Sequence, residues 1–283
     1  MDEPRITIYT PESLLSNPAR LVREMVRDLA ASRELAWRLT VRDLSAQYRQ
    51  TYLGFLWAII LPMANTLVWI FLSRSGVVNI SDTPLPYPIY VFTGTMLWAI
   101  LMDALNAPLQ IVTASKSMLA KINFPREALV IAGIYQTMAN ALIKVTLLLA
   151  ALLAMGFHPD WSLLLLPLGI LSLILAGTVI GLVLTPIGLL YSDVGKAIPL
   201  LMQFLMYLTP VVFAMPKQGL SATLFQLNPL TPLILTARDW LTGLTPEYLG
   251  YFAVVNVVSI VLLFMFWIVF CLAMPILIER MGS

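Results

Sequence analysis

Asp103 and Lys144 are the side chains with the clearest chemical potential, because each lies inside a long apolar stretch. Charged groups are costly within a membrane, so they usually face protein or water and often mark a substrate or ion path. The functional interpretation is a site facing a pore, where Lys144 contacts anionic groups of a substrate. The alternative is a structural contact between helices, or a lysine that extends to the membrane surface. Asp103 is expected near one end of its span and Lys144 nearer the middle, so a direct ion pair is not expected.

The sequence offers little material for catalysis or metal binding. Asp103 is the only acid inside a predicted span, and one carboxyl group cannot form an acid–base pair. His158 is the only histidine and Cys271 the only cysteine, which argues against a metal cluster, a Ser-His-Asp triad and disulfides. Gly195-Lys196 lacks the earlier glycine and the following hydroxyl residue of an ATP-binding loop. No metal or cofactor is expected on this chain, and any ATP and magnesium that drive it would be bound by another chain.

The composition is that of a membrane protein. Hydrophobic residues make up 59% of the chain and charged residues 11%, and the mean hydropathy is +0.86, whereas soluble domains carry about 25% charged residues. The net charge of +2 gives no indication of a nucleic-acid partner. A spanning helix needs about 20 apolar residues. The sequence therefore predicts an all-α integral membrane protein with six transmembrane helices, at about residues 53–72, 87–108, 128–155, 161–190, 197–215 and 251–278.

The distribution of lysine and arginine predicts the orientation, because cytoplasmic segments carry more of them. With both termini in the cytoplasm, the external segments hold only Arg74, Lys217 and Arg238. The cytoplasmic segments then hold Arg5, Arg20, Arg23, Arg27, Arg33, Arg38, Arg42, Arg49, Lys116, Lys121, Arg126, Lys196 and Arg280. No signal peptide is expected within the first 50 residues.

Two segments outside the spans have distinctive patterns. Residues 33–52 form an expected amphipathic helix at the membrane interface, with Trp37 and Val41 on its apolar stripe and arginines on another face; a soluble helix packed on a partner is the alternative. Residues 216–250 are expected outside the cell as two half-helices that re-enter the membrane; an ordinary surface loop is the alternative. Residues 1–32 are an expected cytoplasmic extension, and residues 33–283 a single membrane domain.

Two stretches resemble a known family. Residues 42–58 read RDLSAQYRQTYLGFLWA, with Leu61-Pro62 following, and are similar to the N-terminal signature of ABC-2-type polysaccharide exporter permeases, which export O-antigen, capsule and teichoic-acid chains. Residues 121–126 read KINFPR and resemble a loop of the same family. The resemblance runs from about residue 33 to the C-terminus and is most like the O-antigen, or lipopolysaccharide, exporters. Ser192 is a departure, because the family commonly has arginine before the aspartate at this place, so no role of that arginine carries over.

The resemblance implies a subunit of a larger assembly. It implies a homodimer of permeases in the bacterial inner membrane, two ATPase subunits docked on the cytoplasmic side, and export of a lipid-linked glycan. An enzyme of glycan assembly and an ion-coupled transporter are the remote alternatives, as is an ABC-2 permease for drugs or lipids. The residues expected to couple to the ATPase are Arg42, Tyr48, Arg49, Lys116, Lys121, Phe124, Pro125 and Arg126.

A glycan path is expected along the first and fifth spans. Both are uncharged, and aromatic rings along an uncharged wall bind a hydrophilic chain weakly enough for passage. Lipid-facing anchoring or helix packing is the alternative for these aromatic residues. The expected channel-lining residues are Trp57, Trp69, Phe204, Tyr207 and Lys144. The expected external gate is formed by Phe225, Asn228, Pro229 and Trp240.

Overall fold

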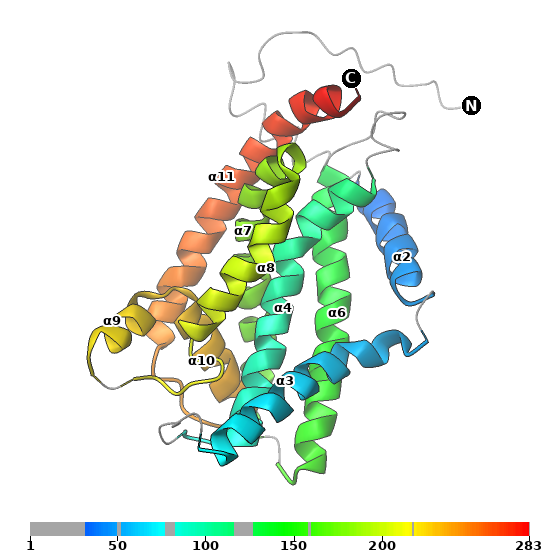
Figure 1. Cartoon of the computed structure of the whole chain (residues 1–283). Coiled ribbons are helices and arrows are strands. Elements are labelled where there is room, and N and C mark those ends of the chain that lie inside the picture. The colour runs from blue at the N-terminus through cyan, green and yellow to red at the C-terminus, as the bar shows by residue number, and fades with distance from the viewer. Residues whose placement is uncertain are drawn as a thin grey trace.

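The computed structural model describes residues 32–49, 52–76, 83–115, 127–157, 160–216 and 218–282, and every regular element among them is helical. Figure 1 shows a bundle of long helices flanked by shorter ones. The elements are α2 (Arg33–Arg49), η2 (Gly54–Leu56), α3 (Trp57–Arg74), α4 (Tyr87–Ala114), α6 (Glu127–Ala154), η3 (Trp161–Leu165), α7 (Leu166–Leu190), α8 (Ser192–Tyr207), α9 (Leu220–Leu227), α10 (Leu230–Thr242) and α11 (Leu249–Gly282).

Four of the six predicted spans correspond to helices that are long and apolar enough to cross a membrane. These are α4, α6, η3 with α7, and α11. Successive long helices alternate in direction, so the ends of α4, α7 and α11 lie together with the start of α6 (Figure 1). Proline is tolerated at the first turns of α4 and α7, where the missing N–H has no helical partner.

The other two predicted spans form shorter helices. The apolar part of α3 is Ile60–Arg74, and α3 runs obliquely across α4 and α6 (Figure 1). The expectation of a continuous helix over residues 197–215 is wrong, because α8 ends at Tyr207. Pro210 explains this end, since it has no N–H to donate and disfavours helical backbone in the preceding residue. At 1.5 Å per residue α8 is about 24 Å long, which is less than the hydrocarbon thickness of about 30 Å.

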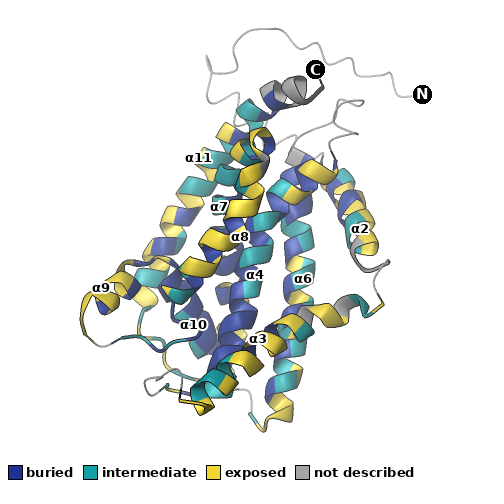
Figure 2. Cartoon of the chain, in the orientation of Figure 1, coloured by how far each residue is buried: buried dark blue, intermediate teal, exposed yellow. Residues whose placement is uncertain are grey.

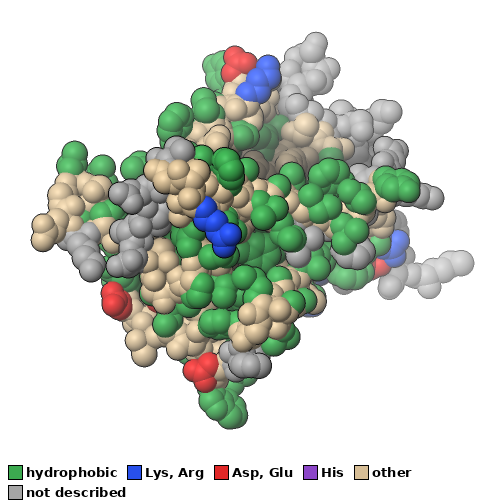
Figure 3. Space-filling model, turned by 60° about the horizontal axis from the view of Figure 1, so that its bottom comes forward, with side chains coloured by type: hydrophobic (Ala, Val, Ile, Leu, Met, Phe, Trp, Pro, Cys, Tyr) green, Lys and Arg blue, Asp and Glu red, His purple; other side chains and the backbone are tan. Residues whose placement is uncertain are grey.

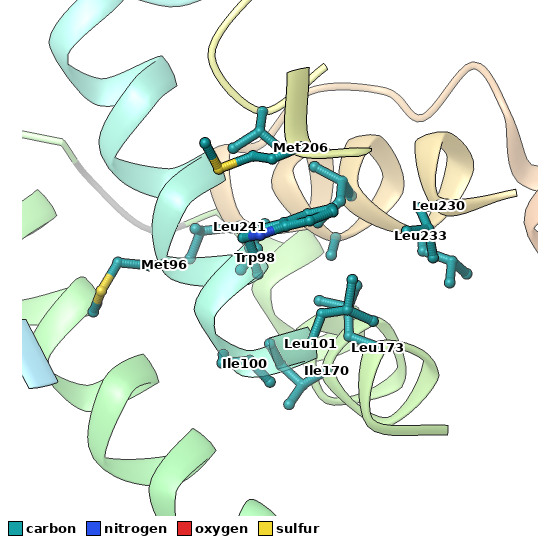
Figure 4. Packing of buried hydrophobic residues seen from close by; sticks show 14 of the residues in the cluster. Met96, Trp98, Ile100, Leu101, Ile170, Leu173, Met206, Leu230, Leu233 and Leu241 are labelled. Carbon is teal, nitrogen blue, oxygen red and sulfur yellow. The ribbon is translucent and has the colours of Figure 1, made fainter. Parts of the chain in front are cut away.

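The core forms where α4 packs against α7, α10 and the end of α8. Figure 4 shows Trp98 among side chains from α4, α7, α8 and α10. Gly177 and Gly181, spaced as in a GxxxG pair, let α7 approach α4 closely: a Cβ at Gly181 would lie 2.4 Å from the carbonyl oxygen of Leu105. Small residues of this kind bring membrane helices together through close backbone packing. Figure 2 shows the result, with α4 mostly buried and much of α3 and α11 exposed.

The predicted amphipathic helix exists as α2, but its packed face differs from its apolar stripe. Ala36, Leu39 and Thr40 are buried against α6, where the Thr40 hydroxyl donates to the carbonyl oxygen of Ala132 at 3.3 Å. Trp37 and Val41 remain 59% and 45% exposed. The packed face of α2 therefore combines small side chains with Leu39, and Trp37, although largely exposed, contacts the Tyr135 ring of α6 edge-to-face at 6.3 Å.

The predicted external segment contains the two short helices α9 and α10. Nearly every side chain of α10 is buried against α4, α7 and η3, whereas α9 extends from the side of the bundle with Leu220 and Leu227 exposed (Figure 1). Gly243, with φ +75°, ends α10 in the left-handed conformation that glycine adopts readily. Figure 3 shows that hydrophobic side chains dominate the described surface when the lower end of the bundle is turned forward.

Candidate functional site

An aromatic cluster joins α3 to the end of α8. The Trp69 ring centroid lies 5.9 Å from that of Tyr207 and 5.3 Å from that of Phe213, both in edge-to-face arrangements. Edge-to-face pairs of this separation are favourable beyond the area that they bury. The structure thus brings together two of the aromatic residues predicted to line a glycan path, and it adds Phe213.

The other two predicted lining aromatics stand apart from this cluster. Phe204 lies on α8 and is 62% exposed, and Trp57 is 44% exposed at the start of α3. Trp57 is twelve residues before Trp69 on α3, or about 18 Å along the helix. Both rings are available to a neighbouring molecule, and the four aromatics do not form one continuous surface within this chain.

Asp103 and Lys144 form a direct ion pair, so the expectation that they would not meet is wrong. The Lys144 ammonium lies 2.7 Å from an Asp103 carboxylate oxygen and donates to the carbonyl oxygen of Ala99 at 3.1 Å. The lysine side chain is 10% exposed and the aspartate side chain 29%. The long, flexible lysine side chain spans the difference in depth between the two residues. The pairing is favourable because an unpaired charge at this depth would be costly. The ammonium is therefore neutralised within the chain.

A polar cavity adjoins this ion pair between α2, α4 and α6. Its volume is about 440 Å³. Polar side chains line it from α4 at intervals of three and four residues and from α6 at an interval of four, so each set lies on one face of its helix. They are Asp103, Asn106 and Gln110 of α4, Gln136, Thr137 and Asn140 of α6, and Asp43 of α2.

The sequence carries a signal of this cavity that the predictions above do not include. Helical spacing places Asp103 in line with Asn106 and Gln110, and Lys144 in line with Gln136 and Asn140, within otherwise apolar spans. The signal lies in the uncharged amides that accompany the two charged residues, and not in the charged residues alone. That α4 and α6 turn these stripes toward each other follows only from their packing.

The chain beyond α8 is held by a buried arginine. Arg238 of α10 is 1% exposed, and its guanidinium donates to the carbonyl oxygens of Pro210 at 2.8 Å and Val211 at 3.0 Å. The same guanidinium lies over the Tyr90 ring, 3.8 Å from its centroid. No carboxylate among the described residues forms an ion pair with it. Carbonyl dipoles and a ring face therefore balance its charge.

Tyr90, Asn228 and Gly94 lie beside the same segment of the chain as Arg238, and we call these four residues together the clamp. The Tyr90 hydroxyl lies 3.0 Å from the carbonyl oxygens of both Pro210 and Phe213. The Asn228 amide donates to the carbonyl oxygen of Leu208 at 3.0 Å. A Cβ at Gly94 would lie 2.3 Å from the guanidinium, so this position has room only for glycine. The clamp satisfies backbone carbonyl groups of residues 208–213, the non-helical segment that follows α8.

Three of the four predicted gate residues, Phe225, Asn228 and Trp240, are buried within the chain, whereas Pro229 is exposed. Phe225 and Trp240 are each 5% exposed, and Trp240 packs edge-to-face on Phe252 at 5.3 Å. Asn228 accepts a hydrogen bond from the Leu230 N–H at 3.0 Å and so caps the start of α10, directly after Pro229. Their observed contacts fix the position of α9 and α10.

A second cavity, of about 500 Å³, lies beside the α10–α11 connection. Asp239, Glu247, Tyr248 and Gln226 are among its lining residues. Burial raises the pKa of Asp239 to about 6, an effect to which the charge of Glu247 adds and which the charge of Arg238 opposes. This carboxyl group therefore keeps its proton to a higher pH than an exposed aspartate does.

The residues predicted to couple to an ATPase are only partly visible. Arg42 lies on the exposed surface of α2, where it pairs with Asp43 at 2.7 Å. Tyr48 and Arg49 belong to the last turn of α2. Lys116, Lys121, Phe124, Pro125 and Arg126 lie outside the described residues.

Comparison with known proteins gives a consistent result. No protein-family model matches the sequence. The chain is 25% identical to the O-antigen export system permease protein RfbA of Myxococcus xanthus, over 74% of this chain and 81% of that protein. It is 21% identical to the protein of the same name from Klebsiella pneumoniae, over 79% and 86%. It is 23% identical to the polysialic acid transport protein KpsM of Escherichia coli, over 77% and 87%.

These relatives agree with the signature in residues 42–58 and with the apolar helices of the structure. The similarity extends well beyond that signature, because it covers about three quarters of the chain. The resemblance found in the sequence is confirmed: over most of its length, the chain is similar to the permease subunits of ABC-type polysaccharide exporters.

Proposed function

We propose that this chain is the membrane-spanning permease subunit of an ABC transporter that exports a lipid-linked polysaccharide across the bacterial inner membrane. The observation that carries the proposal is similarity over about three quarters of the chain to permeases named for O-antigen export and polysialic acid transport. O-antigen is the leading substrate, and a capsular polysaccharide or teichoic acid is the alternative. A drug or lipid exporter is more remote, because none of these relatives is named for such cargo.

Separate ATPase subunits power the transport in this proposal. The sequence contains no ATP-binding loop of its own. Two ATPase subunits dock near the cytoplasmic connection between α4 and α6 and against the exposed surface of α2. Arg42, which lies on that surface of α2, is the described residue best placed for this contact, and the coupling residues of the connection act with it.

The proposed channel forms between two copies of the chain. Apolar side chains of α3 and α8 that face away from the bundle support this arrangement, since they leave large rings such as Phe204 exposed. In the assembled dimer α3 and α8 complete the six spans, α2 lies in the inner interface, and α9 with α10 re-enters the outer leaflet. Both termini are then cytoplasmic. The clamp keeps Phe225 and Trp240 in place, so that the α9–α10 pair moves as one unit when the outer mouth opens.

Deleting the gene in its native host tests the proposed function. We expect loss of one surface polysaccharide and accumulation of its lipid-linked form on the cytoplasmic side, both reversed by the wild-type gene. The ATPase that co-purifies with the chain should be needed for the same polymer. Normal surface polysaccharide in the deletion strain, with no other permease gene able to replace it, would refute the proposal.

Cysteine substitution tests the two-copy channel. We expect Phe204→Cys to form a disulfide between two copies under mild oxidation, because this side chain is 62% exposed on the face assigned to the partner. Cysteine at position 253, an exposed position on α11 outside the proposed α3 and α8 contact, is the control and should not cross-link. The measurement is a dimer band on a non-reducing gel of membranes that are exporting polymer. Cross-linking at the control position alone would place the dimer contact on α11.

A further inference from the structure

The polar cavity between α2, α4 and α6 is unfavourable in a membrane unless its polar groups have hydrogen-bond partners. This indicates that the cavity holds a hydrophilic molecule. Gln110, which is exposed, and Gln136, which is half-buried, both line the cavity, and their side-chain amides form no hydrogen bond to any other described residue. Each amide carries two donors and an acceptor with two lone pairs. At membrane depth such groups need water or a bound polar molecule, because hydrocarbon cannot satisfy them.

The position of the cavity connects it to one end of the bundle. Gln110 lies about 6 Å and Asn106 about 12 Å from the end of α4, at 1.5 Å per residue. Gln136 lies about 14 Å from the start of α6 by the same measure. The end of α4 and the start of α6 flank the connection that is predicted to be cytoplasmic. A hydrophilic chain could therefore enter from that side and reach the Asp103–Lys144 pair.

The charges of the cavity indicate which kind of molecule fits it. Both carboxylates that line it are already paired: Asp43 with Arg42, and Asp103 with Lys144, each at 2.7 Å. Arg42 and Lys144 lie beside the lining and balance its two carboxylates, so neither a free cation nor a phosphate group meets an unpaired opposite charge. Amide groups suit hydroxyl groups, since both can donate and accept hydrogen bonds. A volume of about 440 Å³ is within the usual range for a small-molecule site, about 300–1,000 Å³.

We propose that this cavity binds neutral sugar units of the exported polymer through Gln110, Gln136 and the neighbouring amides of α4 and α6. The proposal rests on the proposed export function and adds a sugar site between α2, α4 and α6 to the aromatic path expected along α3 and α8. Hydrogen bonds to uncharged hydroxyl groups are individually weak, which allows a long chain to be held and then released unit by unit. The Asp103–Lys144 pair closes the deep end of the site and positions α4 against α6.

The test uses the double variant Gln110→Leu and Gln136→Leu. Leucine has a similar size and removes no hydrogen bond to a described residue, so the variant should insert and fold as the wild type does. We expect about a tenfold fall in the rate of polymer export, from the loss of hydrogen bonds to sugar hydroxyls. The control is Gln226→Leu on α9, an exposed amide outside this cavity, which should export normally. Export at the wild-type rate by the folded double variant would refute the sugar site.

A photo-cross-linking amino acid at position 136 identifies the occupant directly. The probe is the native lipid-linked polymer of cells in which this gene is required for export. We expect an adduct that carries glycan and that disappears when the first sugar transfer of polymer synthesis is blocked. An adduct of phospholipid only, or no glycan adduct at all, would refute the sugar site and leave the export function standing. If the gene proves unnecessary for export, the proposed function itself fails, so the two failures are distinguishable.

Discussion

Replacing Arg238 with alanine is expected to remove most of the folded protein from the membrane. The change deletes two charge-assisted hydrogen bonds, to Pro210 and Val211, and a contact with the Tyr90 ring. It also leaves a buried carbonyl group without a partner and opens a cavity in the core. We expect a loss on the order of 4 kcal/mol, which is a large share of the 5–15 kcal/mol that stabilises most proteins. The measurement is the thermal midpoint and the yield of monodisperse protein in detergent.

A second substitution at position 238 separates the contribution of the guanidinium shape to stability from that of its charge, and a substitution elsewhere serves as the control. Arg238→Lys keeps the charge but cannot donate to two carbonyl oxygens as a fork, so its thermal midpoint should lie between those of alanine and wild type. Arg74→Ala is the matched control, because Arg74 is exposed at the end of α3 and should tolerate the change. If Arg238→Ala were as stable as Arg74→Ala, the clamp would have no structural role.

Replacing Asp103 with leucine is expected to destabilise the chain strongly, because it leaves the ammonium of Lys144 buried without a counter-ion. Removing one partner of a buried pair costs about 3–5 kcal/mol in soluble proteins. Asp103 is 29% exposed, so water reaches the pair and the lower end of that range is expected here. The double variant Asp103→Leu with Lys144→Leu should recover most of the loss, since no charge remains buried. The thermal midpoints of both single variants and the double variant form the test.

The matched comparison for the ion pair is the exposed pair of Glu34 and Arg38 on α2. Their side chains are 77% and 75% exposed, and exposed pairs contribute about 0–1 kcal/mol. Breaking this pair should therefore change the thermal midpoint little. If the effects of the Asp103 and Lys144 variants on the thermal midpoint simply added in the double variant, with no recovery of stability, the direct ion pair would be contradicted.

The sequence predicted the long helices well, because their apolar length and proline positions are local properties. The predicted span at residues 87–108 corresponds to α4. This helix continues to Ala114 because Pro108 is tolerated inside it. The run at 128–155 became α6 almost unchanged. The end of α8 was missed, since an apolar run does not show where Pro210 turns the chain out of the helix.

Other features depend on contacts between distant segments and could not be derived from local pattern. Arg238 counted as an external charge, yet it is buried because carbonyl groups from the end of α8 and a ring from α4 surround it. Phe225 and Trp240 were predicted to form an external gate, and their burial depends on the packing of α9 and α10 against the bundle. The apolar stripe of α2 was visible in the sequence, but the packing of Ala36, Leu39 and Thr40 in place of that stripe follows from the surface of α6.

ATP-driven export of a lipid-linked polysaccharide is tested most directly in inside-out membrane vesicles. The vesicles contain this chain with its co-purifying ATPase, and the lipid-linked polymer of the host is added with ATP. The measurement is the fraction of glycan that becomes protected from a glycosidase outside the vesicles. The proposed function predicts protection that requires ATP, this chain and the ATPase together. The proposed function would be contradicted if an ion gradient protected the glycan without the ATPase. It would also be contradicted if the vesicles took up a hydrophobic drug and transported no glycan.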